Sequence, residues 1–231
     1  KTIYWAIDFE PQKRFKNFIK NTLYHRINIH SYKTADEMWD LSPRMAKARE
    51  EFLHFSPKKY KIHKIVPYGV WTNRIKKYNY DRCKQKTLVF MGHIIEKQGA
   101  QLVIKAMPRI IQKIPDFKFK IIGEGNYQQE LIKLAKKEKV IEHCDFKGKL
   151  AREILEDEIA SSAIAIAPYI KKLDTWTYYA DPGKVKTYIA CGVPVLLTNI
   201  PWNAKELEAN RCGMIISESE EDIEKKILFL M

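Results

Sequence analysis

The sequence predicts an α/β fold: a doubly wound parallel sheet domain, preceded by the tail of a second domain of similar construction. Two observations predict it. Short apolar runs alternate along the chain with longer segments of helical spacing. Several of these runs, such as residues 193–197 (VPVLL), lack polar alternation, which is typical of strands buried on both faces of a parallel sheet.

Residues 1–70 are expected to be the C-terminal part of a truncated first domain. Its predicted elements are strands at 2–9, 35–41 and 61–66, a helix at 14–29 and a helix that starts at Ser42 and Pro43. Serine is a favoured N-cap and proline a favoured first helical residue. Helical spacing predicts the buried residues, which are Phe15, Phe18, Ile19, Leu23 and Ile27 in the first helix and Met45, Ala48, Phe52 and Leu53 in the second.

Residues 71–86 are polar, basic and unpatterned, and they are predicted to be an interdomain linker. Residues 87–231 make the second domain. Its predicted strands lie at 87–91, 117–122, 144–146, 163–167, 193–197 and 213–216. Its predicted helices lie at 99–114, 127–138, 150–161, 183–192, 204–210 and 220–231. Because the chain opens without a methionine and stops inside an apparent helix, we expect both of its ends to be cut.

Composition narrows the class of protein. An apolar content of 45% with 12% aromatic residues suffices for packed cores, so the chain is not disordered as a whole. The four cysteines form no C-x-x-C pair, which favours reduced thiols over a disulfide framework or a zinc site. The net charge of +13 points to an anionic partner: a phosphate-bearing ligand, an anionic lipid surface or nucleic acid. The alternative is a lysine-rich surface without such a partner.

The stretch DPGKVKTYIACGVPVLLTN, from Asp181 to Asn199, organises the second domain. It predicts a short helix that Gly192 ends, with Val185 and Tyr188 inward, and then a buried strand. Lys184, in the first helical turn, is placed to meet an anion that the helix N-terminus favours. The alternative is an ordinary helix–strand unit with a solvated lysine.

Three further loops follow predicted strands of this domain, and the carboxyl ends of parallel strands share the edge where ligands bind. They contain Gly92, His93 and Lys97, then Gly123, Glu124 and Gly125, then Lys147 and Gly148. The G-x-G lacks the third glycine of the dinucleotide fingerprint, which disfavours a Rossmann dehydrogenase. Such a basic rim suits a ligand with two phosphates and no strict need for a metal. A histidine such as His93, taken alone, is more often a structural loop residue than a ligand-binding one.

Other catalytic motifs are absent: the sequence has no HExxH, no P-loop GKS/T, no GxSxG and no clustered set of metal ligands. Aromatic residues mix with lysines around Trp176, Tyr178 and Tyr179. These rings either stack on a sugar or base or pack on their own domain.

These segments together resemble glycosyltransferases of GT-B fold, close to glycosyltransferase family four. ADEMWDLSPRM and KIHKIVPYGV are similar to the end of that family's N-terminal domain. LVFMGHIIEKQG, FKFKIIGEGNYQQEL, FKGKL and PGKVKTYIACGVPVLLTN are similar, in order and spacing, to its donor-binding domain. The resemblance implies two Rossmann-like domains, with residues 87–231 binding a nucleotide-sugar.

The resemblance also implies roles for individual residues. Gly92, His93, Lys97 and Lys184 would bind the donor's diphosphate. Gly123, Glu124, Gly125, Lys147, Gly148 and Thr187 would lie along the base and ribose, and Asp174, Tyr179 and Asp181 are candidates on the sugar side. The sequence departs from the family at three of these positions, because Tyr179 and Thr187 replace two glutamates and His93 replaces an arginine. Asp174, Asp181 or Glu206 would supply a carboxylate instead, and no catalytic residue is assigned.

The resemblance therefore implies a retaining, metal-independent glycosyltransferase without a cofactor, acting in glycan biosynthesis. It would move a sugar from a nucleoside-diphosphate donor to a hydroxyl of a glycan, a lipid-linked acceptor or a protein. We expect a cytoplasmic protein, peripheral at the inner membrane face if the anionic partner is a membrane surface. The alternatives are a non-catalytic nucleotide-sugar binder, another GT-B enzyme such as an epimerase, and, less favoured, a basic nucleic-acid-binding module.

Overall fold

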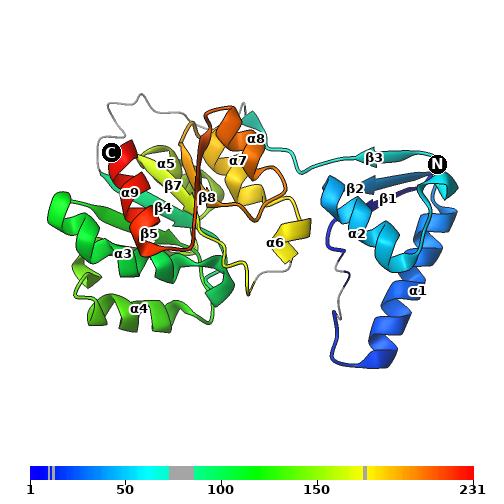
Figure 1. The fold of residues 1–231 in the computed structure, drawn as a ribbon, viewed down its shortest axis with the longest axis horizontal. Helices are drawn as coiled ribbons and strands as arrows, with labels where there is room; N and C mark the ends of the chain where they lie inside the picture. Colours follow the sequence, from blue (N-terminus) through cyan, green and yellow to red (C-terminus); the bar gives the residue numbers. More distant parts are fainter. Residues whose placement is uncertain (10, 12–13, 73–85, 174–175) are drawn as a thin grey trace. The chain divides into compact units, whose positions relative to one another are not determined.

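The computed structural model describes the chain except for residues 10, 12–13, 73–85 and 174–175 (Figure 1). It divides into two compact units. The first comprises residues 1–68 and 175–182, and the second comprises residues 69–174 and 183–231. The predicted linker at 71–86 lies mostly outside the described residues. Each unit is considered by itself.

The first unit is built on a three-stranded parallel sheet in the order β1-β2-β3. Its strands are β1 (Ile3–Ala6), β2 (Glu37–Asp40) and β3 (His63–Ile65). Its helical segments are α1 (Phe18–Thr34), α2 (Pro43–Leu53), the 3₁₀ turn η1 (Pro57–Lys59) and α6 (Trp176–Tyr179). The predicted elements of this part are present, with shorter strands than expected. The helix predicted at 14–29 begins later, at Phe18, and ends at Thr34, so Phe15 precedes it and is 38% exposed instead of inward.

Helix α2 begins as its sequence predicts. The Ser42 hydroxyl accepts a hydrogen bond from the backbone N–H of Met45 at 3.0 Å, and Pro43 occupies the first helical position. Met45 and Ala48 are buried, but Phe52 is 43% exposed, so its predicted inward position is wrong. The Ser42 hydroxyl also donates to the carbonyl of Tyr179, and the guanidinium of Arg44 lies 4.2 Å from the ring centroid of Tyr178. These contacts attach α6 to α2.

The predicted buried face of α1 is wrong. Its apolar residues point outward: Phe18 is 78% exposed, and Ile19, Leu23 and Ile27 are 74%, 58% and 55% exposed. The helix buries Asn21, Asn28 and Tyr32 instead. The two asparagines can be buried because their amides are hydrogen-bonded to backbone carbonyls and, for Asn28, to the hydroxyls of Tyr4 and Tyr32.

The second unit contains a six-stranded parallel sheet in the order β6-β5-β4-β7-β8-β9. Its strands are β4 (Thr87–Met91), β5 (Lys118–Ile122), β6 (Cys144–Gly148), β7 (Ile164–Ala167), β8 (Val195–Thr198) and β9 (Gly213–Ile216). Its helices are α3 (Ala100–Lys113), α4 (Gln128–Lys137), α5 (Arg152–Ala160), α7 (Gly183–Ala190), α8 (Ala204–Ala209) and α9 (Glu220–Leu230). Its described residues also include two 3₁₀ turns, η4 (Glu96–Gln98) and η5 (Ile141–His143). The predicted doubly wound fold is confirmed.

Two apolar cores cover the two faces of this sheet. One joins the sheet to α3, α4 and α9, and the other joins it to α5, α7 and α8 (Figure 1). The strands alternate between them: Leu88 and Phe90 enter the first core, and Val89 enters the second. Because β4 and β7 are neighbours whose onward connections leave in opposite directions, the loops at their carboxyl ends flank the opening where ligands bind in such sheets.

Two further observations concern the described part of the chain. No helix in it is long and apolar enough to cross a membrane. Its three cysteines, Cys144, Cys191 and Cys212, are free thiols.

Candidate functional site

The loops after β4 and β5 are joined by backbone hydrogen bonds. The N–H of Gly92 donates to the carbonyl of Ile122 at 2.9 Å, and the N–H of Ile94 donates to the carbonyl of Glu124 at 2.8 Å. The N–H of Tyr127 donates to the carbonyl of Ile94 at 3.1 Å. The structure thus brings the predicted Gly92 and Gly123–Gly125 loops together at one edge of the sheet.

Close approach of the backbones explains the G-x-G sequence. A Cβ atom on Gly123 would lie 1.9 Å from the carbonyl oxygen of Gly92, and one on Gly125 would lie 2.0 Å from that of Ile94. Any larger side chain would push these loops apart. The two glycines therefore have a structural reason in addition to the predicted place along a nucleotide, which stays a prediction.

The third predicted loop adjoins the second, but its lysine is engaged elsewhere. The N–H of Gly123 donates to the carbonyl of Gly148 at 2.9 Å. The ammonium group of Lys147 lies 2.9 Å from a carboxylate oxygen of Asp145 and 3.3 Å from one of Glu158 on α5. The hydrogen bond with Asp145 raises the pKa of Lys147, so the ammonium stays charged. Its predicted place near the base stays a prediction.

Lys147 belongs to a charged cluster between the edge of the sheet and α5. A hollow of about 740 Å³ opens there, between the β5–β6 edge and α5. Lys120, which is 9% exposed, lies 2.8 Å from Glu158 inside it. Lysines and carboxylates alternate around this hollow, so its charges neutralise one another. The hollow therefore favours no anionic ligand, although it is larger than the one beside the glycine loops.

The Gly92 loop also contacts the loop after β7. The N–H of Ile170 donates to the carbonyl of Lys97 at 3.0 Å. A hollow of about 390 Å³ opens beside the Gly92 loop. It is lined by Ile95, Glu96, Lys97, Asn126, Tyr127 and Leu173. His93 and Glu124 are exposed on the same two loops. A ligand at this edge would find backbone N–H groups, one lysine and an aromatic ring within reach.

Lys184 lies where the sequence predicts a phosphate-binding lysine. It is the second residue of α7, whose first N–H groups have no partner within the helix. Its ammonium group lies 4.5 Å from the ring centroid of Phe90 and 5.1 Å from that of Tyr169, and it donates to the side-chain oxygen of Gln98. The lysine thus lies at the start of the helix, between two aromatic rings, and its predicted role in binding a diphosphate stays a prediction.

Helix α7 also carries Thr187, for which the sequence predicts a site role, and Tyr188, for which it does not. Thr187, at the position of a family glutamate, donates its hydroxyl to the carbonyl of Gly183 at 3.2 Å. Tyr188 was predicted only as a core residue. It is fully buried, and its hydroxyl accepts the backbone N–H of Met91 at 2.6 Å. Burial raises the pKa of Tyr188, which keeps this hydroxyl neutral.

The predicted sugar-side candidates are not described as part of this group of loops. Tyr179 and Asp181 belong to the first unit. The carboxylate of Asp181, which is 1% exposed, accepts the N–H of Tyr68 at 2.7 Å. Asp174 lies outside the described residues. Glu206 is exposed on α8. Their sugar-side roles stay predictions.

The described residues contain no cluster of three or more histidine, cysteine or carboxylate side chains that could hold a metal ion. The positive charge that the described residues supply near the glycine loops comes from lysines such as Lys97 and Lys184 and from helix N-termini. Such groups neutralise phosphate oxygens through directed hydrogen bonds.

Comparison with known proteins identifies relatives. The family model described as glycosyl transferases group 1 matches residues 73–231. A GDP-mannose-dependent monoacylated alpha-(1-6)-phosphatidylinositol monomannoside mannosyltransferase of Corynebacterium glutamicum is 28% identical over 137 residues, which are 57% of this chain and 34% of the relative. A GDP-mannose-dependent alpha-(1-6)-phosphatidylinositol monomannoside mannosyltransferase of Mycobacterium tuberculosis is 22% identical over 160 residues, 65% of this chain and 42% of the relative. The chain thus spans less than half the length of either.

Solved structures share the fold. WaaG, a glycosyltransferase involved in lipopolysaccharide biosynthesis, matches 99% of this chain and 65% of its own, with a TM-score of 0.75 and 17% identity. HepE of Anabaena, in complex with UDP and glucose, matches 98% of this chain and 61% of its own, with a TM-score of 0.72 and 15% identity. The expected α/β fold with parallel sheets is confirmed.

Proposed function

This chain belongs to the glycosyl transferases group 1 family, and on that premise we propose that it transfers a sugar from a nucleoside-diphosphate donor to an acceptor hydroxyl. The observation that carries the proposal is the position of Lys184. Its ammonium group, the N-terminus of α7 and the Gly92 turn meet beside the opening between β4 and β7. A diphosphate bound there would be neutralised by the lysine and the helix dipole.

Thermal shift on the full-length protein tests this donor site. The panel is GDP, UDP, ADP, CDP and NAD, and GDP comes first because two relatives are named GDP-mannose-dependent. We expect one nucleoside diphosphate to raise the melting temperature, because a ligand at 100 times its Kd adds about 2.7 kcal/mol to the free energy of unfolding. Stabilisation by NAD alone would contradict the proposal.

Two lysine variants localise the effect. Lys184→Ala should weaken binding of the stabilising nucleotide about tenfold to a hundredfold, as expected for one hydrogen bond to a charged group. Lys186→Ala, two residues along the same helix, is the matched control and should leave the Kd within about twofold. Equal losses in both variants would mean that only the general positive charge matters.

The same site leads us to propose a retaining reaction without a metal or another cofactor. Lys184 and the helix N-terminus supply the positive charge that the departing diphosphate needs. Full activity in excess EDTA and a product anomer that matches the donor's would support this mechanism. Loss of activity in EDTA that Mg²⁺ restores, or an inverted anomer, would contradict it.

A non-catalytic nucleotide-sugar binder is the second candidate. Thr187 and Tyr179 stand in place of two glutamates of the resembled family, and the Thr187 hydroxyl is bonded to its own helix. An epimerase of the same fold is the third. Radiolabelled sugar transfer by the full-length protein distinguishes them: a binder gives no product, and an epimerase changes the nucleotide-sugar without transferring it.

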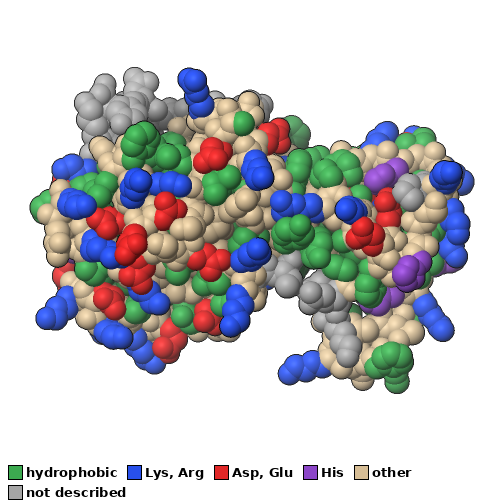
Figure 2. All heavy atoms as spheres, viewed as in Figure 1, with side chains coloured by type: hydrophobic (Ala, Val, Ile, Leu, Met, Phe, Trp, Pro, Cys, Tyr) green, Lys and Arg blue, Asp and Glu red, His purple; other side chains and the backbone are tan. Residues whose placement is uncertain are grey.

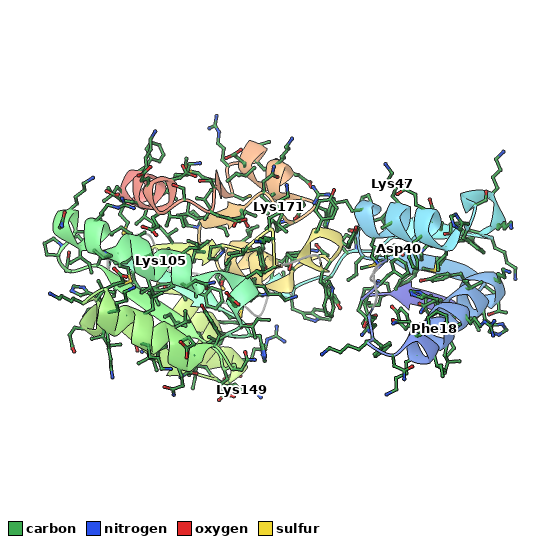
Figure 3. All side chains as sticks on the ribbon, turned by 60° about the horizontal axis from the view of Figure 1, so that its bottom comes forward. Phe18, Asp40, Lys47, Lys105, Lys149 and Lys171 are labelled. Carbon is green, nitrogen blue, oxygen red and sulfur yellow. The ribbon has the colours of Figure 1, made fainter. Side chains whose placement is uncertain are left out.

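We propose a glycan or lipid-linked acceptor, and an anionic membrane surface as the place where the protein meets it from the cytoplasm. Phe18, Ile19, Leu23 and Ile27 make an exposed apolar stripe on α1, and Figure 3 labels Phe18 on this helix. No acidic residue occurs between Arg14 and Thr34, and Lys16, Lys20, Arg26 and Lys33 are exposed around the stripe. Each basic residue near an anionic bilayer contributes about 1 kcal/mol.

Vesicle sedimentation tests the membrane proposal. We expect the full-length protein to bind phosphatidylserine-containing vesicles at low salt and to bind pure phosphatidylcholine vesicles weakly. Ile19→Ser with Leu23→Ser should abolish binding. The matched control is Phe229→Ser on α9, a residue as exposed as Ile19, at 74%. Absence of binding, or equal loss with the control, would contradict the proposal and indicate that protein covers the stripe.

Nucleic acid remains the less favoured partner. Figure 2 shows lysine and arginine side chains interspersed with carboxylates over the visible face of the second unit rather than gathered in one stripe. Nucleic-acid-binding surfaces concentrate their positive charge. Salt-sensitive binding of an oligonucleotide that competes with GDP or UDP would favour this alternative.

A further inference from the structure

We propose that the hydroxyl group of Tyr188 is a positioning group for the diphosphate site, holding the Gly92 turn in place beside Lys184. The inference rests on the proposed function, because it states how that site keeps its shape. Tyr188 does not need to touch the ligand for this role.

The hydroxyl fills a gap in the sheet. Strand β4 pairs with β5 along its whole length, as far as Met91 opposite Ile122. It pairs with β7 only through Leu88 and Val89. Beyond Val89 the two strands at the opening have no ladder pairs, although β4 continues for two residues.

The gap leaves one backbone donor without a strand partner. N–H groups of a parallel strand point alternately to its two neighbours. Since the N–H of Gly92 donates to Ile122 of β5, the N–H of Met91 points toward the β7 side. The Tyr188 hydroxyl accepts it at 2.6 Å and lies 3.4 Å and 3.5 Å from the carbonyl oxygens of Met91 and Ile166. One side chain thus touches the backbone of both strands.

The same helix face carries the proposed phosphate ligand. Lys184 and Tyr188 are four residues apart on α7, so both point to the opening. A Cβ atom on Gly92 would lie 2.7 Å from the ammonium nitrogen of Lys184. The phenol therefore fixes the residue that precedes the turn, and the lysine lies against the turn itself. Loss of the hydroxyl would let the turn move relative to the lysine.

Binding of paired nucleotides by the full-length protein tests this role. Kd values are measured for GDP and GMP, and for UDP and UMP, with wild type and Tyr188→Phe. We expect the preference for the diphosphate over the monophosphate to fall about three- to tenfold, the size of one neutral hydrogen bond. Tyr32→Phe, which removes a buried hydroxyl in the first unit, is the matched control and should leave the preference unchanged.

The outcomes separate the inference from the proposed function. If neither diphosphate binds the wild type, the donor site itself fails and the inference fails with it. If one binds and Tyr188→Phe leaves the preference unchanged, or weakens both nucleotides equally, Tyr188 has only a structural role. In a Lys184→Ala background the Tyr188→Phe effect on the preference should disappear.

Hydrogen exchange on the unmutated protein gives a second measurement that does not depend on a variant folding. The amide of Met91 should be protected without ligand, because the Tyr188 hydroxyl accepts it. Exchange at residues 92–95 should slow when the binding nucleotide is added. A freely exchanging Met91 amide would overturn the inference.

Discussion

Apolar residues at helical spacing are buried in a helix of the second unit and exposed in a helix of the first unit. In α3 of the second unit Val103, Ala106 and Met107, which recur at helical spacing, are completely buried. In α1 of the first unit the corresponding stripe is exposed and asparagines are buried. A periodic pattern thus identifies a helix and a face, but the neighbours of the helix decide whether that face meets the core or something else.

The core of the first unit also differs from those of the second unit in how polar it is. The second unit is closed by apolar packing on both faces of its sheet. The small core of the first unit surrounds a buried ion pair, in which Arg49 lies 2.5 Å and 3.2 Å from the two carboxylate oxygens of Asp40 and both residues are 0% exposed. Figure 3 labels Asp40 at the end of β2. His63 adds a contact to Asp40 at 2.8 Å, and Tyr60 contacts Arg49.

The largest expected effect comes from breaking this ion pair. Burial alone lowers the pKa of Arg49, but hydrogen bonds and the charge of Asp40 raise it above its ordinary value, so the guanidinium stays charged. Asp40→Ala leaves that charge buried without its partner and should cost about 3–5 kcal/mol. Urea unfolding of the first unit measures it. The double variant Asp40→Leu with Arg49→Met should recover most of the free energy of unfolding that Asp40→Ala loses. If the double variant loses as much as Asp40→Ala, packing matters more than charge at this position.

A matched pair of isoleucines tests the comparison directly. Ile104→Ala removes a completely buried side chain of α3 and should cost about 2–5 kcal/mol in the second unit. Ile19→Ala makes the same chemical change on the exposed face of α1 and should change the free energy of unfolding by less than about 0.5 kcal/mol. Thermal or urea unfolding compares them. A large cost for Ile19→Ala in solution would mean that α1 is packed against protein.

A smaller effect is expected where the glycine loops meet. Gly125→Ala places a Cβ atom 2.0 Å from the carbonyl oxygen of Ile94, so the backbone must move. Overpacking of this kind costs about 1–3 kcal/mol, and we expect it to weaken nucleotide binding as well. Gly69→Ala is the control, because its added Cβ would have no atom within 4 Å apart from those of Gly69 itself and its two neighbours in the chain. Comparable unfolding midpoints for both variants would show that the loops adapt.

Much of the second unit could be predicted because its strands and helices carry their own periodicity. The loop residues Gly92, Gly123 and Gly148 could be grouped because parallel strands end at one edge. Two features could not be predicted. The role of Tyr188 depends on where β4 and β7 stop pairing, and the attachment of α6 to α2 depends on contacts between residues far apart in sequence.

Some differences had a sequence indication. Lys147 is two residues after Asp145, and side chains at this spacing share one face of a strand, so an ion pair was foreseeable. On α1, asparagines at 21 and 28 are seven residues apart, a helical spacing that competes with the apolar stripe. The prediction that the apolar stripe of α1 is buried was wrong. The small three-stranded sheet packs against polar residues instead, because their amides are hydrogen-bonded to the backbone.

The smallest expected effect is a pH dependence of the first unit. Glu37 is 3% exposed, and hydrogen bonds from Lys1, Trp39 and Lys64 lower its pKa from 4.5 to about 2. Because the folded state holds this proton less tightly than the unfolded state, Glu37 stabilises the first unit above pH 4.5 and loses that contribution as the pH falls toward 2. The free energy of unfolding should therefore decrease over this window.

Glu37→Gln should remove this decrease in the free energy of unfolding between pH 4.5 and 2. Glu51→Gln, a change at an exposed position on α2, should preserve it. Urea unfolding between pH 2 and 6, followed separately for each unit, provides the measurement. The second unit should keep its profile in both variants, because Glu37 contributes only to the first sheet. A parallel change in both units would contradict the view that the first unit alone depends on this buried carboxylate, and would indicate that the two unfold together.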